Sequence, residues 1–426
     1  MGARPPRGTP AGDRRARGVA MKAATRAGST RRATAPTGLA VAVATLAVLV
    51  AACSGPILAN PALSPVAPAT PTPAPSLAPD PQPVAFPRDD GPHDRLTEWW
   101  YYTGHLRAAD GRRFGFQAVV FRAERGAVPV TWASQLALTD EFGDRFRYGQ
   151  RSEIGPQVDR SPRAADGTPT GFALAITGFD PAAPDWLARE PWIFGGSGGR
   201  DVIKAAVSPD EAVTADGGFG LALDLVAQKP PALQGGIGWI DFGPAGSSYY
   251  YSRSRMAATG MLTLDGEPLQ VEGTAWFDHQ WGDFISVGAG GWDWFAVNLA
   301  DGTDLAISLV RAPDGTWPIA FGTLVDAAGR TTALSRDMFE VVADPARTWT
   351  SPDTGATYPA GWTIRVPGEA LVIDLEPTVA AQELDTRATT GVVYWEGSQV
   401  VTATRAGIPV AGEAYVELTG YAAAVP

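Results

Sequence analysis

The sequence predicts an all-β protein that contains two tandem antiparallel β-barrels produced by an internal duplication. Three observations support this prediction. The chain of 426 residues carries 49 glycines and 14 tryptophans, without a long stretch of helical periodicity. Short alternating segments are separated by Gly, Pro and Asp-Gly turns, as expected for strands. Four segments of the first half recur in the same order in the second half.

The expected strands are short and are joined by tight turns. Apolar and polar residues alternate over residues 114–120 and 221–225, which is the period of a half-buried strand. Asp-Gly pairs at 110–111, 265–266 and 301–302 lie between such runs and favour hairpin turns. The sequence therefore predicts an antiparallel arrangement in which neighbouring strands pair.

The repeated segments divide the body into two halves. Residues 100–122 resemble 294–311, 138–143 resemble 324–329, 221–225 resemble 371–375, and 273–278 resemble 412–417. Four matches in one order indicate duplication. Each half then has enough strands for a barrel of roughly eight strands, a size that can enclose one small ligand.

The first 52 residues have the pattern of a lipoprotein signal peptide, with Met21 as an alternative start. A basic segment precedes the uncharged apolar run 39–52, which is short for a membrane span. The run ends Val-Ala-Ala before Cys53, the single cysteine of the chain. This pattern fits a lipobox, so we expect Cys53 to be lipidated, and two acyl chains on one residue give stable anchoring. The alternative is an ordinary secretory signal followed by an incidental cysteine.

The rest of the chain is expected to comprise three segments. Residues 53–86 form a linker rich in Pro and Ala, residues 87–285 an N-terminal barrel domain, and residues 286–426 a C-terminal barrel domain. After the basic leader, 25 basic and 44 acidic residues remain. Such an acidic body argues against nucleic acid as a partner. We expect an exported protein, anchored on the outer face of the cytoplasmic membrane or on its periplasmic side.

Long aromatic motifs carry a family resemblance. EWWYYTGHL at 98–106, WFDHQWG at 276–282 and GWDWFAVNLADG at 291–302 resemble the carotenoid 1,2-hydratase/AttH-like family, and the resemblance covers nearly all of residues 86–421. It implies two lipocalin-like β-barrels in tandem. It also implies a hydro-lyase activity, the addition of water to a carbon–carbon double bond, on an apolar isoprenoid or lipid-like molecule.

The hydration of an alkene needs an acid held in a fixed position and an environment that stabilises a carbocation. The faces of aromatic rings provide such an environment. The segment 276–281 contains both kinds of side chain. We expect Asp278 to be the acid and His279 a supporting donor. Neighbours on a strand point to opposite faces, so either Asp278 faces the cavity and His279 the domain seam, or the reverse. Alternatively, the two residues form a buried hydrogen-bond clasp between the barrels.

The remaining candidate residues are mostly aromatic and are expected to contact the substrate. We expect Glu98 to lie at the cavity mouth or the domain interface, and Arg255 to pair with Asp278 or with a ligand carboxylate. The full set of expected binding residues is Glu98, Trp99, Tyr101, Tyr251, Arg255, Trp276, Trp281, Trp292 and Trp294.

Other site chemistries have weaker support. The three histidines, His93, His105 and His279, lie in or beside the aromatic motifs, but their spacing matches no metal-ligand motif, so no metal or other cofactor is expected. The Gly-rich segment 195–199 lacks the setting of a serine nucleophile. Two functions stay open: an acid-catalysing enzyme, and a non-catalytic binding or carrier module for a hydrophobic ligand.

Overall fold

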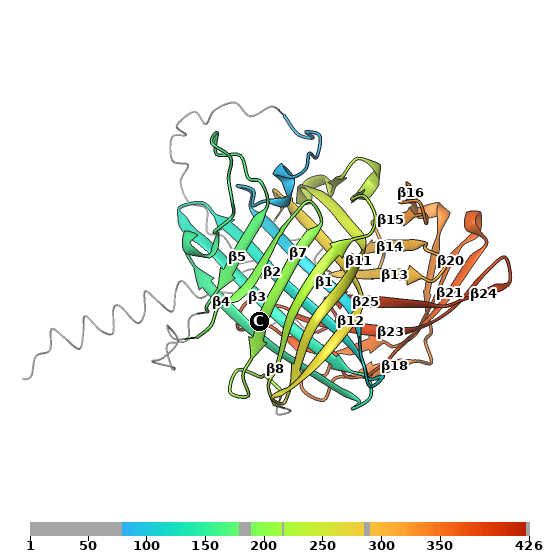
Figure 1. Cartoon of the computed structure of the whole chain (residues 1–426). Helices are drawn as coiled ribbons and strands as arrows, with labels where there is room; N and C mark the ends of the chain where they lie inside the picture. Colours follow the sequence, from blue (N-terminus) through green and yellow to red (C-terminus); the bar gives the residue numbers. More distant parts are fainter. Residues whose placement is uncertain (1–78, 179–188, 215–216, 285–289, 423–426) are drawn as a thin grey trace, which may run out of the picture. The chain divides into compact units, whose positions relative to one another are not determined.

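The computed structural model describes residues 79–178, 189–214, 217–284 and 290–422 (Figure 1). The expected signal peptide, Cys53 and most of the linker lie outside these ranges, as does the expected domain boundary at 285–286. The described residues form β-strands and short 3-10 helices but no α-helix, which confirms the all-β prediction. Among them, no helix combines the length and the hydropathy that crossing a bilayer requires.

Twelve strands form the first sheet, in the order β4-β3-β2-β1-β12-β11-β8-β7-β6-β5, with β9 and β10 also paired to β11. All pairs are antiparallel, and β5 lies against β3 and β4, so the sheet curls until its two ends meet. The strands are β1 Thr97–Ala108, β2 Arg113–Arg125, β3 Val128–Asp140, β4 Arg145–Ile154, β5 Phe172–Ile176, β6 Trp192–Ser197, β7 Arg200–Val207, β8 Phe219–Ala227, β9 Ala232–Leu233, β10 Trp239–Asp241, β11 Ser247–Leu264 and β12 Glu267–Gly282.

Eleven strands form the second sheet, in the order β16-β15-β14-β13-β25-β23-β21-β20-β17, with β22 and β24 also paired to β23. A separate hairpin joins β18 and β19. The strands are β13 Trp292–Leu299, β14 Asp304–Val310, β15 Ile319–Val325, β16 Thr331–Ser335, β17 Glu340–Ala343, β18 Thr348–Thr350, β19 Thr357–Pro359, β20 Trp362–Val366, β21 Leu371–Pro377, β22 Glu383–Asp385, β23 Val393–Arg405, β24 Ile408–Val410 and β25 Gly412–Thr419.

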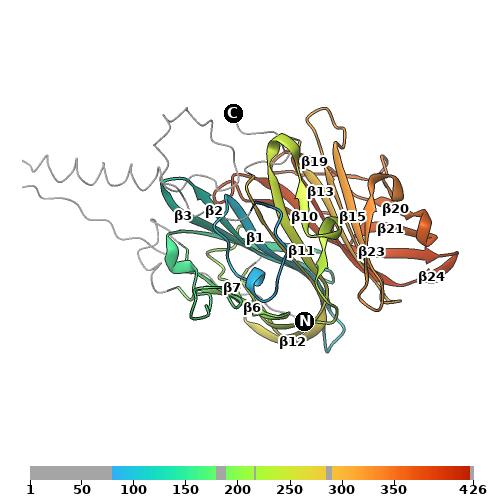
Figure 2. The same ribbon diagram turned by 90° about the horizontal axis from the view of Figure 1, so that it is seen from above.

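The 3-10 helices are single turns that lie before or between strands. Of these, η1 matters most for the site, because it lies in the segment that precedes β1 and crosses the open end of the first barrel (Figure 2). The helices are η1 Arg88–Asp90, η2 Pro156–Val158, η4 Gln234–Gly236, η5 Gly243–Ala245, η6 Arg336–Met338 and η7 Pro367–Glu369.

The two sheets repeat one topology. In each, the first strand pairs with the last, β1 with β12 and β13 with β25, and the four repeated segments fall on equivalent strands. Tyr101 lies opposite Asp278, and Trp294 lies opposite Glu417. Tyr101 is therefore the equivalent of Trp294. The sequence match that paired residue 100 with Trp294 was wrong by one position. The two hairpins differ in length, since Asp110 lies ten positions after Trp100 whereas Asp301 lies seven positions after Trp294.

Alternation along β1 and β12 assigns neighbouring side chains to two different cores. Even-numbered residues of β1, such as Trp100, and odd-numbered residues of β12, such as Phe277, fill the interior of the first barrel. Residues of the opposite parity, Tyr101 and Trp276, pack against Trp294 of the second sheet. We call this second core the seam. The period of two thus separates the chemistry at residue 278 from that at residue 279.

Candidate active site

A cavity of about 240 Å³ lies in the seam between the two sheets. Two carboxyl side chains, Asp278 of β12 and Glu417 of β25, reach it. Its walls are mainly aromatic. Trp99, Tyr101, Phe121 and Tyr250 come from the first sheet, Phe242 and Phe284 from the segments that follow β10 and β12, and Trp292, Trp294 and Phe321 from the second sheet. Such a cavity suits an apolar ligand held by few polar groups.

Asp278 is held by three hydrogen-bond donors. The Tyr250 hydroxyl donates to its Oδ2 at 2.6 Å, the Trp276 indole donates to its Oδ1 at 2.7 Å, and the Ser252 hydroxyl also donates to Oδ1. Burial raises the pKa of Asp278 to about 6, although these three hydrogen bonds act in the opposite direction. Asp278 is thus fixed in place and changes its protonation just below neutral pH.

Glu417 occupies the position in β25 that Asp278 occupies in β12. Burial raises its pKa to about 7; a hydrogen bond from the Trp292 indole opposes this shift, and the charge of Asp278 adds to it. Behind it, the buried Glu396 accepts a hydrogen bond from the Tyr101 hydroxyl at 2.8 Å. Burial, together with the charge of Glu417, places the pKa of Glu396 well above its usual range.

The three carboxyls share one environment of low polarity. Within the described residues, no Lys, Arg or His side chain lowers the pKa of Asp278, Glu396 or Glu417. Carboxyls that share an apolar site cannot all ionise together, so at least one keeps its proton at neutral pH. The seam therefore offers both a carboxylic acid and a carboxylate to a molecule bound between the aromatic walls.

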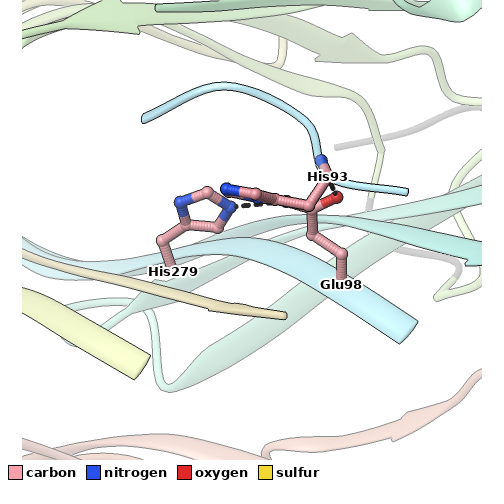
Figure 3. Close-up of side chains that lie close together, drawn as sticks. All are labelled: His93, Glu98 and His279. Carbon is pink, nitrogen blue, oxygen red and sulfur yellow. Dashed lines mark hydrogen bonds and ion pairs between the residues drawn. The ribbon is translucent and has the colours of Figure 1, made fainter. Parts of the chain in front are cut away.

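The opposite face of the same strands carries a second polar cluster, inside the first barrel (Figure 3). Glu98 Oε1 lies 2.8 Å from His93 Nδ1 and 2.9 Å from His279 Nε2. Trp100 stacks on His279 at 4.7 Å, and Trp281 stacks on His93 at 4.1 Å between ring centroids. These side chains do not line the seam cavity.

Comparison with known proteins identifies the family. The sequence model of the AttH-like family matches residues 77–421, which is most of the chain. The chain belongs to the AttH-like family. A crystal structure of an AttH protein from Nitrosomonas europaea matches with 31% identity and a TM-score of 0.65, and the match covers 85% of this chain and 100% of that one. The predicted resemblance and the predicted pair of lipocalin-like barrels are both confirmed.

Two further proteins are similar to this AttH-like chain. The crystal structure of kievitone hydratase from Nectria haematococca matches with 19% identity and a TM-score of 0.56, over 79% of this chain and 93% of that one, which shows a shared fold. Dehydratase asqC of Emericella nidulans is 26% identical over 159 residues. That match covers 35% of this chain and 44% of the dehydratase, so the chain spans less than half of that protein's length.

The structure places the expected site residues in two groups. Asp278 lines the seam cavity together with four of the expected aromatic residues, namely Trp99, Tyr101, Trp292 and Trp294. Trp276 packs in the seam and donates to Asp278. By contrast, Glu98, Tyr251, Trp281 and His279 lie inside the first barrel. Of the two alternatives for residues 278 and 279, the second is the one observed: Asp278 faces the domain seam and His279 faces the interior of the first barrel. The cavity that Asp278 lines lies in that seam.

Two expected contacts are wrong. Glu98 does not lie at the domain interface, because it is an even-numbered residue of β1. It is fully buried in the first barrel, in contact with His93 of the segment that crosses the open end of that barrel. Arg255 does not pair with Asp278; it bonds to Asp304 of β14 at 2.6 Å. A bulge in β11 between Arg253 and Met256 removes Arg255 from the regular register and directs it to the second sheet.

Sequence reasoning missed several residues of the cavity. Glu417 was recognised only as the repeat partner of Asp278 in an ordinary strand, and Tyr250, Phe121 and Phe321 were not assigned to a site. The duplication itself carried the signal for Glu417. Equivalent strands that pack against each other across a seam bring equivalent positions together, so an acid at 278 and an acid at 417 should have been expected to meet.

Proposed function

We propose that this AttH-like protein is a hydro-lyase that adds water to a carbon–carbon double bond, or removes water to form one, in an apolar isoprenoid or lipid-like molecule bound in the seam cavity. The observation that carries the proposal is the pair Asp278 and Glu417, two carboxyls of raised pKa between aromatic walls. The similarity to a dehydratase and the fold shared with a hydratase support the same reaction class.

The geometry suggests a role for each carboxyl. Glu417, with the higher pKa of about 7, gives its proton to one alkene carbon as the double bond breaks. The cation left on the other carbon is stabilised by the faces of Trp99, Trp292 and Trp294. Asp278 takes a proton from water while the water oxygen bonds to that cation. Transfer of this proton from Asp278 back to Glu417 restores the site, and dehydration is the reverse sequence.

Isotope labelling tests this proposal. The purified protein is incubated with a panel of isoprenoid alkenes in water enriched in oxygen-18, and products are read by mass spectrometry. We expect a product that has gained one labelled water, and a loss of about 100-fold or more in rate for Glu417→Gln. Glu413→Gln is the matched control, because Glu413 lies on the same strand near Arg107 and Arg113, outside the cavity. Full activity in Glu417→Gln would overturn the assignment.

One observation favours the alternative of a non-catalytic carrier. Three donors already satisfy Asp278, as they would in a purely structural carboxylate. Native mass spectrometry of protein purified from its own host separates the two functions. The carrier function would be established if the protein carries an isoprenoid or lipid that it releases chemically unchanged, and if it hydrates no member of the panel.

We further propose that the protein acts outside the cytoplasm, tethered through lipidated Cys53. The support is the lipobox-like sequence that ends at the single cysteine, followed by the Pro- and Ala-rich linker. The test is fractionation of Cys53→Ser, which we expect to move from the membrane pellet to the soluble fraction. An unchanged distribution would exclude this tether.

A further inference from the structure

Three side chains converge inside the first barrel, away from the seam. His93 comes from the segment between η1 and β1, Glu98 from β1, and His279 from β12 (Figure 3). One ligand atom from each, His93 Nδ1, Glu98 Oε1 and His279 Nε2, lies within 4.8 Å of the others. The chain thus brings two of its three histidines to one carboxylate.

The hydrogen bonds around these two histidines do not balance for neutral rings. His93 lies between Glu98 Oε1 at 2.8 Å and Asp89 Oδ1 at 3.3 Å, and His279 lies between Glu98 Oε1 at 2.9 Å and the Asp89 carbonyl at 3.1 Å. In each of these four contacts the partner atom is an acceptor. A neutral imidazole has one N–H, so each ring satisfies one acceptor and turns a lone pair toward the other.

Only a positive charge at the centre of the cluster resolves this conflict. If each ring donates its outer N–H to Asp89, both inner nitrogens and Glu98 Oε1 direct lone pairs at one another. One additional proton on His93 would satisfy that ring but would leave His279 with a lone pair turned toward an acceptor. Two additional protons, or one divalent cation among the inner atoms, would satisfy both rings. The cation is the better fit, because two imidazolium rings close together in a buried site repel each other.

We propose that His93, Glu98 and His279 bind a divalent metal ion of the zinc class. Two imidazoles and one carboxylate are a common ligand set for such ions, which also leaves a position open. Asp89 accepts from the outer nitrogen of both rings and so would fix their orientation, as partners of metal-bound histidines do. Nothing in this site depends on the proposed hydro-lyase reaction, since it lies on the other face of β1 and β12.

Binding of an ion requires the cluster to contract around it. Bonds of zinc to nitrogen and oxygen place tetrahedral ligand atoms about 3.3 Å apart. The two N···O distances to Glu98, at 2.8 and 2.9 Å, would each lengthen by about half an ångström. The two histidine nitrogens, which lie within 4.8 Å of each other, would approach by about 1.5 Å. His93 can supply this shift because it lies outside the strands.

An approach from solvent exists on the side of His93. Its side chain is 19% exposed, whereas those of Glu98 and His279 are fully buried. A pocket of about 520 Å³ reaches the cluster there and is lined by His93, Asp89, Tyr249 and Trp281. The open coordination position would therefore face water or a small ligand. A bound ion would also fasten the segment before β1 to the barrel.

Metal titration of full-length protein tests the site. The protein is purified without a polyhistidine tag, treated with chelator and titrated with Co²⁺, followed by visible absorption, and with Zn²⁺, followed by calorimetry. We expect one equivalent to bind, with the intense visible bands of four-coordinate Co²⁺, and bound Zn²⁺ to raise the melting temperature. Binding should disappear in His93→Ala and in Glu98→Gln.

Two variants keep the test decisive. His93→Ala changes a partly exposed side chain outside the strands, so the variant is expected to fold even if Glu98→Gln does not. His105→Ala is the matched control, because this third histidine lies elsewhere, bonded to the Ala414 carbonyl at 3.0 Å, and should keep one equivalent of metal. Absence of saturable binding in the unmodified protein, or equal binding in His93→Ala, would overturn the proposal.

Discussion

At the scale of single residues, the period of two in β12 separates two kinds of chemistry. Asp278 accepts hydrogen bonds in the seam, and its neighbour His279 accompanies Glu98 inside the first barrel. The sequence could predict that these two side chains diverge. It could not predict what each faces, because that depends on which sheet packs against which face of the strand. The structure therefore makes Glu417, rather than His279, the partner of Asp278.

Glu417 should make stability depend on pH. Its pKa is raised from 4.5 to about 7 in the folded protein, so the folded state binds this proton more tightly than the unfolded chain does. This contribution to stability is complete below about pH 4.5 and is lost as the pH rises through 7. We expect the free energy of unfolding of Glu417→Gln, relative to the unmodified protein, to increase by about 1–3 kcal/mol from pH 5 to pH 8.

Urea unfolding at several pH values measures this effect. Glu413→Gln, on the same strand, reports the general consequence of removing a carboxylate from β25. If the difference between Glu417→Gln and the unmodified protein stays constant with pH, Glu417 does not titrate in the range assigned to it.

At the scale of elements, the hairpins were predictable and the irregularities were not. The Asp-Gly pairs at 110–111, 265–266 and 301–302 do connect β1 to β2, β11 to β12 and β13 to β14. The bulge in β11 has no comparable signal in the sequence. Before it, Tyr251 points into the first barrel, and after it the even-numbered Met256 does so. One extra residue thus reverses the parity of the strand and moves Arg255 to an unexpected partner.

The close pairing of β1 with β12 depends on a glycine. A methyl group at Gly273 would overlap the carbonyl oxygen of His105, a backbone atom that cannot move without disturbing the strand pair. We expect Gly273→Ala to reduce the free energy of unfolding by about 1–3 kcal/mol. Thermal and urea unfolding provide the measurement. Gly368→Ala is the control, because no atom lies within 4 Å of the added methyl there. Equal stability of the two variants would show that the strands can separate without cost.

At the scale of the whole described body, duplication explains both the fold and the place of the cavity. Four weak sequence matches predicted two copies of one topology, and equivalent strands carry them. The one-residue error in the match between residues 100 and 294 did not affect the predicted fold class. It would, however, have assigned the side chains of β13 to the wrong faces of the strand. Prediction of a site therefore needs the register that pairing fixes, whereas prediction of a fold class needs only the order of strands.

Contact between the two sheets is expected to depend on Asp304 of β14. This fully buried carboxylate accepts from Arg255 at 2.6 Å and from Lys229 at 2.7 Å, both contributed by the first half of the chain. The Ser254 hydroxyl of β11 also donates a hydrogen bond to it, at 2.9 Å. In Asp304→Asn, two cations at the interface lose their counter-charge. Removing one partner of a buried pair costs about 3–5 kcal/mol, and the partial exposure of Arg255 favours the lower end.

We therefore expect Asp304→Asn to lower the free energy of unfolding by about 3 kcal/mol, measured by urea unfolding. Asp374→Asn, at an exposed position of β21, should change it by less than about 0.5 kcal/mol. Because the cavity takes its walls from both sheets, Asp304→Asn should also weaken binding of any ligand found in the seam, although residue 304 does not line it. A variant as stable as the Asp374→Asn control would mean that the apolar seam alone holds the two sheets together.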